Sequence, residues 1–316
     1  MTRPAEAPEP LRFRSILLPL DGSPFAEQAI PWAAAIARKA RARLRLALVH
    51  QSPSPPPLDK SSARLYTKVE LAVRKAERQY LREVAGRIRN GGAIQLATAS
   101  LSGSTAPALA EYVREVGVDL VVMTTHGRSG LQRAWLGSVA DHLVRTLEIP
   151  MLLIRPREGE ADMSEPGLEE ILVPLDGSRR AEAALPPAVA MGWLFGARLA
   201  LVQTVEPVVR MVGAPVVLPE TLNEELTALK RGEAQDYMEG LAERIGELGV
   251  PTRATAVLGG TAVAGIEAAA RSPGVGMIAM ATHGRGGLRR LVLGSVADKL
   301  VRTGELPVLV TRPRGK

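Results

Sequence analysis

The chain shows the same order of apolar and polar segments twice. Short runs of isoleucine, leucine and valine, such as 15–20 and 120–123, predict strands buried on both faces, as in a parallel sheet. Between them lie longer stretches with apolar positions at helical spacing. We therefore expect an α/β fold: two tandem doubly wound, five-stranded, mainly parallel sheets with helices on both faces, as in Rossmann-like proteins.

The predicted elements of the two copies correspond to one another. Strands are expected within 15–23, 42–50, 94–101, 120–123 and 149–156, and again within 170–178, 197–203, 252–258, 277–280 and 306–313. Long charged helices are expected at 61–90 and 219–248. The first helix of each copy, 24–39 or 179–195, contains Pro31 or the Pro186–Pro187 pair, which predicts a kink or a late start.

Polar segments mark the expected domain boundaries. Residues 1–14 form a polar tail, 15–156 a first domain, 157–169 a short linker and 170–316 a second domain. After the second strand the copies diverge, with a proline-rich connector at 51–58 and a longer, apolar one at 206–219. The apolar connector must bury its aliphatic side chains, either over a binding cleft or against the other domain. The sequence leaves both possibilities open.

The strongest internal repeat is residues 126–145, which recur as 283–302 with 15 of 20 positions identical. Each copy follows an apolar strand, passes through a glycine-rich loop and a Gly-Ser pair, and ends in an amphipathic helix. Such a repeat indicates either a ligand site or a tight turn before a serine-capped helix. Because every glycine recurs at the same spacing, we favour the site.

The layout of this repeat suits a phosphate group. The glycine directly after the histidine of each repeat lets bare backbone approach a ligand. The helix after the Gly-Ser pair presents unpaired N–H groups and the positive end of its dipole. The arginine that follows this glycine would add positive charge. The residues concerned are Gly127, Arg128, Gly137 and Ser138 in the first copy and Gly284, Arg285, Gly294 and Ser295 in the second.

These motifs resemble those of the universal stress protein family in its tandem two-domain form. The family's nucleotide-binding branch carries Gly-x2-Gly-x9-Gly-Ser/Thr after its fourth strand, and the repeat matches its last three positions in both copies. Thr124 and Ala281 stand where the family has its first glycine, so a Cβ faces any ligand there. The resemblance covers nearly all of the chain and implies the adenine-nucleotide α-hydrolase-like form of the fold, with ATP as the ligand.

The resemblance also implies roles for residues outside the loop. Asp21 and Asp176 end their strands where open α/β sheets place ligands, and would contact the ribose or a phosphate-bound metal such as Mg²⁺. An Asx turn within the backbone is the alternative for both. Adenine would be approached by Val49, Met123, Val202 and Met280, and the amides that hold the phosphates would extend to Val139 and Val296. Ordinary core positions are the alternative for these valines and methionines, and we expect Ser23 and Ser178 to be helix caps.

Composition narrows the function further. Hydrophobic residues make up 46% and charged residues 23%, as in globular proteins. The net charge is +7, but acidic residues are interleaved with the basic ones and aromatics are only 3%, so nucleic-acid binding is not expected. The basic clusters at 38–45 and 312–316 are interpreted as a solvated helix end and a tail. Without cysteine, a secretion signal or a membrane-length apolar run, a cytoplasmic protein is expected.

Residues for rapid catalysis are not evident. There is no Walker lysine, and His50, His126, His142 and His283 lack metal-ligand spacing. His126 and His283 are expected to hydrogen-bond the glycine loop. We therefore expect ATP binding without fast turnover, in a regulatory stress-response protein that acts on an unknown signalling partner. A nucleotide-free interaction module and a slow ATPase are the alternatives.

The closing strands suggest how the domains associate. The apolar segments 151–154 and 308–311 are expected at sheet edges, where bare apolar strands invite aggregation. Antiparallel pairing of the two edges would form an internal pseudo-dimer, as single-domain members of the family are implied to dimerise. A homodimer of the whole chain is also possible.

Overall fold

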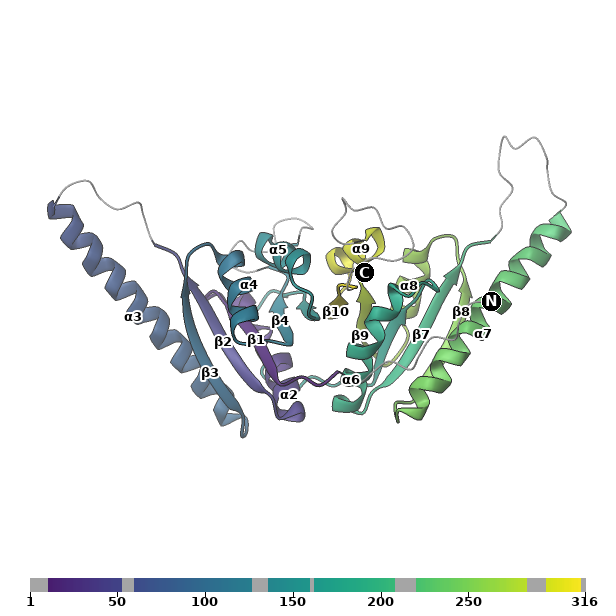
Figure 1. The fold of residues 1–316 in the computed structure, drawn as a ribbon, viewed down its shortest axis with the longest axis horizontal. Coiled ribbons are helices and arrows are strands. Elements are labelled where there is room, and N and C mark those ends of the chain that lie inside the picture. Colours follow the sequence, from purple (N-terminus) through teal and green to yellow (C-terminus); the bar gives the residue numbers. More distant parts are fainter. Residues whose placement is uncertain are drawn as a thin grey trace. The chain divides into compact units, whose positions relative to one another are not determined.

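The structure, a computed structural model, describes residues 11–52, 60–126, 136–159, 162–207, 220–282 and 294–313 (Figure 1). The chain divides into two compact units, one spanning Phe13–Pro166 and one that includes Gly167–Lys316. We call them the first and second domains. The tail, linker and domain limits expected from the sequence stay predictions at the level of single residues.

The first domain is a five-stranded parallel sheet with the order β3-β2-β1-β4-β5. Its strands are β1 (Ser15–Leu20), β2 (Arg43–His50), β3 (Gln95–Ser102), β4 (Leu120–Thr124) and β5 (Met151–Ile154). Its helices are α1 (Pro24–Glu27), α2 (Ile30–Ala40), α3 (Lys60–Asn90), α4 (Thr105–Glu115) and α5 (Ser138–Thr146). The strand order reverses between β1 and β4, which is the position where doubly wound sheets form a ligand-binding crevice.

The second domain repeats this topology with the order β8-β7-β6-β9-β10, again all parallel. Its strands are β6 (Glu170–Pro174), β7 (Arg198–Val205), β8 (Thr252–Leu258), β9 (Val275–Ala281) and β10 (Val308–Thr311). Its helices are η1 (Ala181–Ala184, a 3₁₀ turn), α6 (Leu185–Phe195), α7 (Glu220–Glu247), α8 (Ala262–Ala270) and α9 (Ser295–Thr303). The fold class expected from the sequence is confirmed.

Prolines interrupt the first helix of each domain, as predicted. The first domain has a one-turn α1 and then α2, with Pro31 in the first turn of α2. The second domain has the 3₁₀ turn η1 and then α6, with Pro186 and Pro187 in its first turn. Proline is tolerated at these positions because the first-turn N–H groups have no intrahelical partner to lose.

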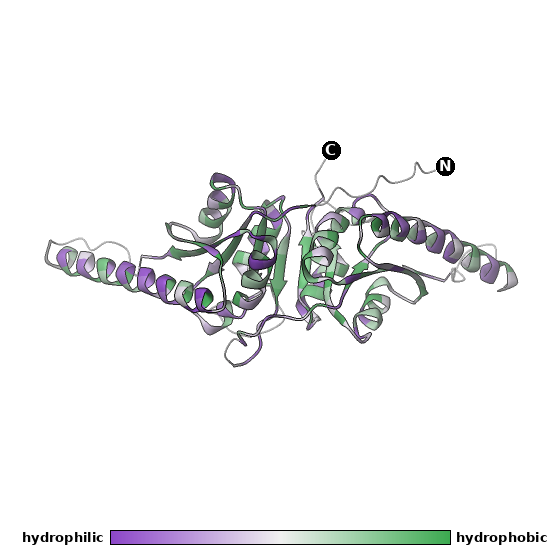
Figure 2. Ribbon diagram, turned by 90° about the horizontal axis from the view of Figure 1, so that it is seen from below, coloured by the Kyte–Doolittle hydropathy of each residue, from purple (hydrophilic) through white to green (hydrophobic). Residues whose placement is uncertain are grey.

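The core is built from the strands and the helix faces that cover them. Strands β1, β4 and β6 are buried almost throughout, and Figure 2 shows hydrophobic residues concentrated in the strands. The long helix α3 contributes its C-terminal half, where Leu81, Val84 and Ile88 are buried. Its N-terminal half leaves Leu65 and Leu71 largely exposed. Only part of this helix therefore stabilises the domain through burial.

Two further expectations are not resolved. Strand β5 pairs with β4 and β10 pairs with β9, and the internal pseudo-dimer through these closing strands stays a prediction. Residues 53–59 and 208–219 lie outside the described residues, so the place of the apolar connector stays open.

A buried carboxylate lies at the amino end of β6. Glu170 is 1% exposed. Arg253 donates to it at 2.6 and 2.9 Å, and Arg198 donates at 2.5 Å. The hydrogen bond from Arg253, aided by Arg198, holds the pKa of Glu170 below its ordinary value although burial acts in the opposite direction. The carboxylate is therefore ionised and paired in the folded domain.

Glu170→Gln is expected to lower the free energy of unfolding at pH 7 by about 1–3 kcal/mol, because a buried charge-assisted hydrogen-bonding group is lost. Folding lowers the pKa of this carboxyl group. Its contribution to the free energy of unfolding is therefore fully present above the pKa of the unfolded state, about 4.3, and is lost as pH falls through the pKa of the folded state. Urea titrations of both proteins from pH 7 to 3 should show the difference shrinking below about pH 4. Glu169→Gln, at an exposed neighbour, is the control. Equal stability of Glu170→Gln and the parent at pH 7 would contradict this account.

Candidate functional site

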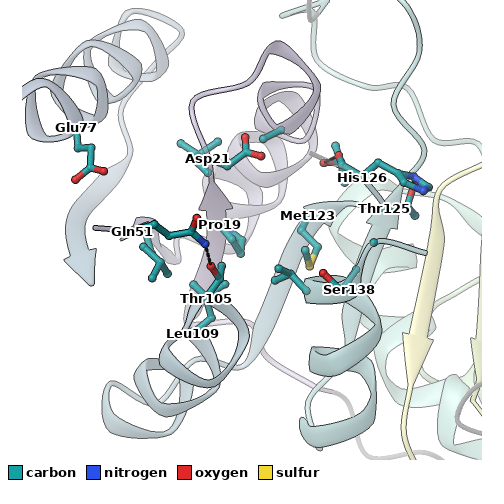
Figure 3. Close-up of a pocket in the computed structure, with 18 of the residues that line it drawn as sticks. Pro19, Asp21, Gln51, Glu77, Thr105, Leu109, Met123, Thr125, His126 and Ser138 are labelled. Carbon is teal, nitrogen blue, oxygen red and sulfur yellow. Dashed lines mark hydrogen bonds between the residues drawn. The ribbon is translucent and has the colours of Figure 1, made fainter. Parts of the chain in front are cut away.

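A cavity of about 510 Å³ opens in the first domain at the carboxyl ends of β1, β2 and β4 (Figure 3). Its size is that of a small-molecule or cofactor site. Six of the residues predicted from the sequence line it together: Asp21, Val49, Met123, Gly137, Ser138 and Val139. Gly127 and Arg128 lie outside the described residues. The structure thus brings together, in one crevice, residues that are more than a hundred positions apart in the chain.

Asp21 is held at the end of β1 by a turn of the backbone. Its Oδ1 accepts hydrogen bonds from Ser23 N at 2.9 Å and Ser23 Oγ at 2.6 Å. Asp176 accepts from Ser178 N at 2.9 Å in the same way. The Asx turn is therefore present in both domains. It does not exclude a ligand role, since a carboxylate has acceptor sites on two oxygens and Asp21 still lines the cavity.

Ser23 caps α1, as expected, because its Oγ accepts from Ala26 N at 3.2 Å. Ser178 is not the cap that was expected: its Oγ accepts from Ala181 N at 3.2 Å, but the N-cap of η1 is Arg180. Both serine hydroxyls therefore bond the backbone where the chain turns from the strand into the first helix. The aspartate between strand and cap is thereby held in one position at the mouth of the crevice.

Gly137 brings the start of α5 against the end of β4. Its N–H donates to Thr125 O at 2.8 Å, and a Cβ at this position would lie 2.8 Å from that same oxygen. Gly137 is also the N-cap, and no side chain caps the helix. Gly294 has the same role before α9 and donates to Thr282 O. The alternative of a serine-capped helix is therefore wrong, and the first-turn residues of α5 line the cavity instead.

Thr124 stands at the position of the first glycine of the family motif, and its side chain is accommodated in the fold. Its side chain is buried, and Oγ1 donates to His126 O at 2.7 Å. Thr124 therefore fixes the backbone that leaves β4, while it also lines the cavity. Ala281 has no hydroxyl and cannot form this bond, which is a difference between the two domains.

His126 marks the start of the glycine loop. Its Nδ1 lies 3.1 Å from Thr125 Oγ1. Burial, aided by the positive charge of Arg155, lowers the pKa of His126. The neutral form of the ring is therefore favoured, in which one nitrogen donates a hydrogen bond and the other accepts one. His283 lies outside the described residues.

Sequence reasoning missed four polar residues of the cavity: Gln51, Glu77, Thr105 and Thr125. Gln51 follows β2 and donates from Nε2 to Thr105 Oγ1 at 2.9 Å, which connects β2 to α4 (Figure 3). Its place after a parallel strand was a usable signal, because ligands bind at the carboxyl ends of such strands. Glu77 enters from α3, and no sequence pattern tells which face of that long helix meets the cavity.

His50 holds Glu77 in place. The His50 side chain is buried, with Nδ1 2.9 Å from Glu77 Oε2 and Nε2 2.7 Å from Glu70 Oε1. Its ring thus lies between two carboxylates of α3. This contact fixes the wall of the cavity that α3 supplies.

The second domain places its predicted residues at corresponding points. Asp176 follows β6, Val202 and Met280 are buried in β7 and β9, and Gly294 precedes α9. Ser295 and Val296 form the first turn of α9. Gly284 and Arg285 lie outside the described residues.

Metal ligands and membrane-spanning helices were both sought in the fold. Within the described part of the chain, no three His, Asp or Glu side chains come close enough together to hold a metal by themselves. A metal at Asp21 or Asp176 would therefore need ligand oxygens as well. Among the described residues, no helix has the length and apolar composition that a membrane crossing requires.

Two doubly wound parallel sheets, the first with a crevice at its switch point, define a two-domain α/β protein. The model of the universal stress protein family matches residues 12–155 and 167–312, and the chain belongs to this family. Universal stress protein Rv1996 of Mycobacterium tuberculosis is 27% identical over 94% of both chains. Rv2005c of the same organism is 28% identical over 65% of each chain, so the chain spans just under two thirds of that relative's length.

Solved structures agree with the fold. A universal stress protein from Archaeoglobus fulgidus has a TM-score of 0.71 at 19% identity, over 96% of this chain and 100% of its own. Another solved member of the family is a complex with cAMP; it matches 46% of this chain and 98% of its own at 24% identity, with a TM-score of 0.34.

Proposed function

We propose that each domain binds one adenine nucleotide, ATP in the first instance, and that occupancy regulates a stress-response partner protein. The observation that carries this proposal is the crevice of the first domain. It has apolar walls from Val49 and Met123, a carboxylate from Asp21, and the uncapped start of α5. These are the surfaces that a base, a ribose and a phosphate chain require.

The start of α5 suits the phosphates. Gly137, Ser138 and Val139 line the cavity, and the first N–H groups of a helix have no intrahelical acceptor. The helix dipole adds partial positive charge at the same end. Backbone amides therefore bind phosphate oxygens here without a Walker lysine. In the second domain, Gly294, Ser295 and Val296 would do the same.

The carboxylates explain why a cation would accompany the nucleotide. Asp21 and Glu77 both line the cavity, and Glu77 is already in contact with His50. Asp21 would repel a phosphate chain unless a divalent cation lay between them. A single carboxylate with phosphate oxygens is a usual environment for Mg²⁺. Asp21, and Asp176 in the second domain, would thus hold Mg²⁺ together with the bound nucleotide.

Calorimetric titration of the whole chain with ATP and Mg²⁺ tests this function. We expect two binding events per chain, and adenine nucleotide in the heat extract of the purified protein. A single event that Gly137→Ala removes would restrict the function to the first domain, where Thr124 Oγ1 bonds His126 O. No binding of ATP, ADP, AMP or cAMP would overturn the proposal.

A further inference from the structure

A second, smaller cavity lies at the other end of the first domain's sheet. Its volume is about 200 Å³, and it is formed where β1 and β2 begin and α2 ends. Four arginines and one serine are among its lining residues: Arg14, Ser15, Arg41, Arg43 and Arg45. Three of these arginines belong to the basic cluster 38–45, which the sequence alone suggested was only a solvated helix end.

The second domain shows what this position holds when it is filled. Ser15 pairs in register with Arg43 as Glu170 pairs with Arg198, so Ser15 and Glu170 occupy equivalent positions. In the second domain, two guanidinium groups surround the Glu170 carboxylate. In the first domain that carboxylate is missing, and Ser15 Oγ accepts from Arg45 Nε at 2.8 Å. Arg43 is the counterpart of Arg198, whereas the counterpart of Arg253 is Ala97. Arg45 supplies a second guanidinium group in the first domain, and a serine stands in place of the carboxylate.

Arg41 adds to the cluster against its backbone preference. It ends α2 in the left-handed region at φ 52°, and it is the one non-glycine residue with positive φ in the described part of the chain. The equivalent residue that ends α6 is Gly196, at φ 67°. Glycine adopts this conformation without strain, whereas arginine does not. A strained arginine at the cavity is expected where its side chain has a use.

Few acidic groups compensate for these charges. Asp119 is near Arg14, but its oxygens accept from the backbone N–H groups of residues 14 and 15 at 2.7 and 3.2 Å. Glu165 pairs with Arg38 and Lys39 instead. Among the described residues, no carboxylate forms an ion pair with Arg41 or Arg43. The cavity is therefore strongly positive.

We propose that this cavity binds a small phosphate-bearing anion, either inorganic phosphate or the terminal phosphoryl group of a metabolite. Guanidinium groups bind such oxygens through paired N–H donors, and here they come from the chain before β1, from β2 and from the end of α2. The volume is below the range of typical cofactor pockets, which favours a single phosphoryl group over a whole nucleotide. The site is independent of the proposed nucleotide site, because it lies at the opposite end of the strands.

Titration calorimetry of the whole chain with inorganic phosphate, at fixed ionic strength in a phosphate-free buffer, tests the site. Arg43→Gln is expected to weaken phosphate binding at least about tenfold, since one charged donor is lost. Ser15→Glu should weaken it as strongly, because it introduces the carboxylate that the second domain already has. Arg114→Gln, an exposed arginine on α4, is the charge-matched control and should leave binding unchanged.

Arg41→Gly separates a binding role from a structural one. It restores the glycine found in the second domain, so the melting temperature without phosphate should rise while phosphate affinity falls. Tighter binding of glycerol 3-phosphate than of phosphate would identify a terminal phosphoryl group, and equal binding would identify free phosphate. The proposal is overturned if phosphate does not bind up to about 10 mM, or if the three variants bind it like the parent. It is also overturned if a short DNA duplex binds far more tightly than phosphate and loses that binding in Arg43→Gln.

Discussion

Gly137→Ala is expected to remove the ATP-binding event of the first domain and to lower that domain's stability by about 1–3 kcal/mol. The added Cβ would lie 2.8 Å from Thr125 O, which is a backbone atom that cannot rotate away. The start of α5 must therefore move off the end of β4, and its amides move with it. Titration calorimetry should show one binding event in place of two, and thermal unfolding should show a lower melting temperature.

The second domain and a second glycine provide the controls. Binding at the unaltered second domain should persist in the same molecule, which shows that the chain is folded. Gly86, within α3, has no atom within 4 Å of an added Cβ. Gly86→Ala should keep both binding events and stabilise the helix by up to about 1 kcal/mol, because alanine is the better helix former. If Gly137→Ala binds ATP like the parent, the start of α5 does not hold the phosphates.

Asp21→Asn is expected to weaken Mg²⁺-dependent ATP binding in the first domain by about 10- to 100-fold. Asparagine keeps a side-chain oxygen for the turn with Ser23, so the melting temperature should change little. What is lost is the charge that would hold the cation. Binding of ATP without Mg²⁺ should be unchanged or tighter, since one negative charge has left the cavity.

Two related variants sharpen this test. Asp176→Asn should have the same effect on the second domain only. Asp21→Ala removes the turn as well as the charge, so it should also lower the melting temperature. An unchanged dependence on Mg²⁺ in Asp21→Asn would show that this aspartate serves the backbone turn alone.

Local patterns were enough to predict the framework of both domains. The strands follow from runs of aliphatic residues, and the split first helices follow from Pro31 and its counterpart, because both effects act within a few residues. The strand-end position of Asp21 and the glycine before α5 could also be predicted from the sequence. The contact between Gly137 and Thr125 O could not, since it joins residues that are separated along the chain.

Other parts of the site depend on tertiary register. Glu77 reaches the cavity only because α3 packs with one particular face on the sheet, and its partner His50 gave no pattern of its own. The arginines at the amino end of β2 were interpreted as a solvated cluster. That these arginines lack the carboxylate found in the second domain is evident only from the strand register, in which Ser15 lies beside Arg43 as Glu170 lies beside Arg198.

The contact between His50 and Glu77 joins α3 to the end of β2 at the wall of the cavity. A ligand that fits the cavity better in one position of α3 must, by thermodynamic linkage, favour that position. A protein that bound the exposed N-terminal half of this helix, around Leu65 and Leu71, would then alter ATP affinity by some factor. ATP would alter the affinity for that protein by the same factor. Occupancy could thus be communicated to the surface without hydrolysis.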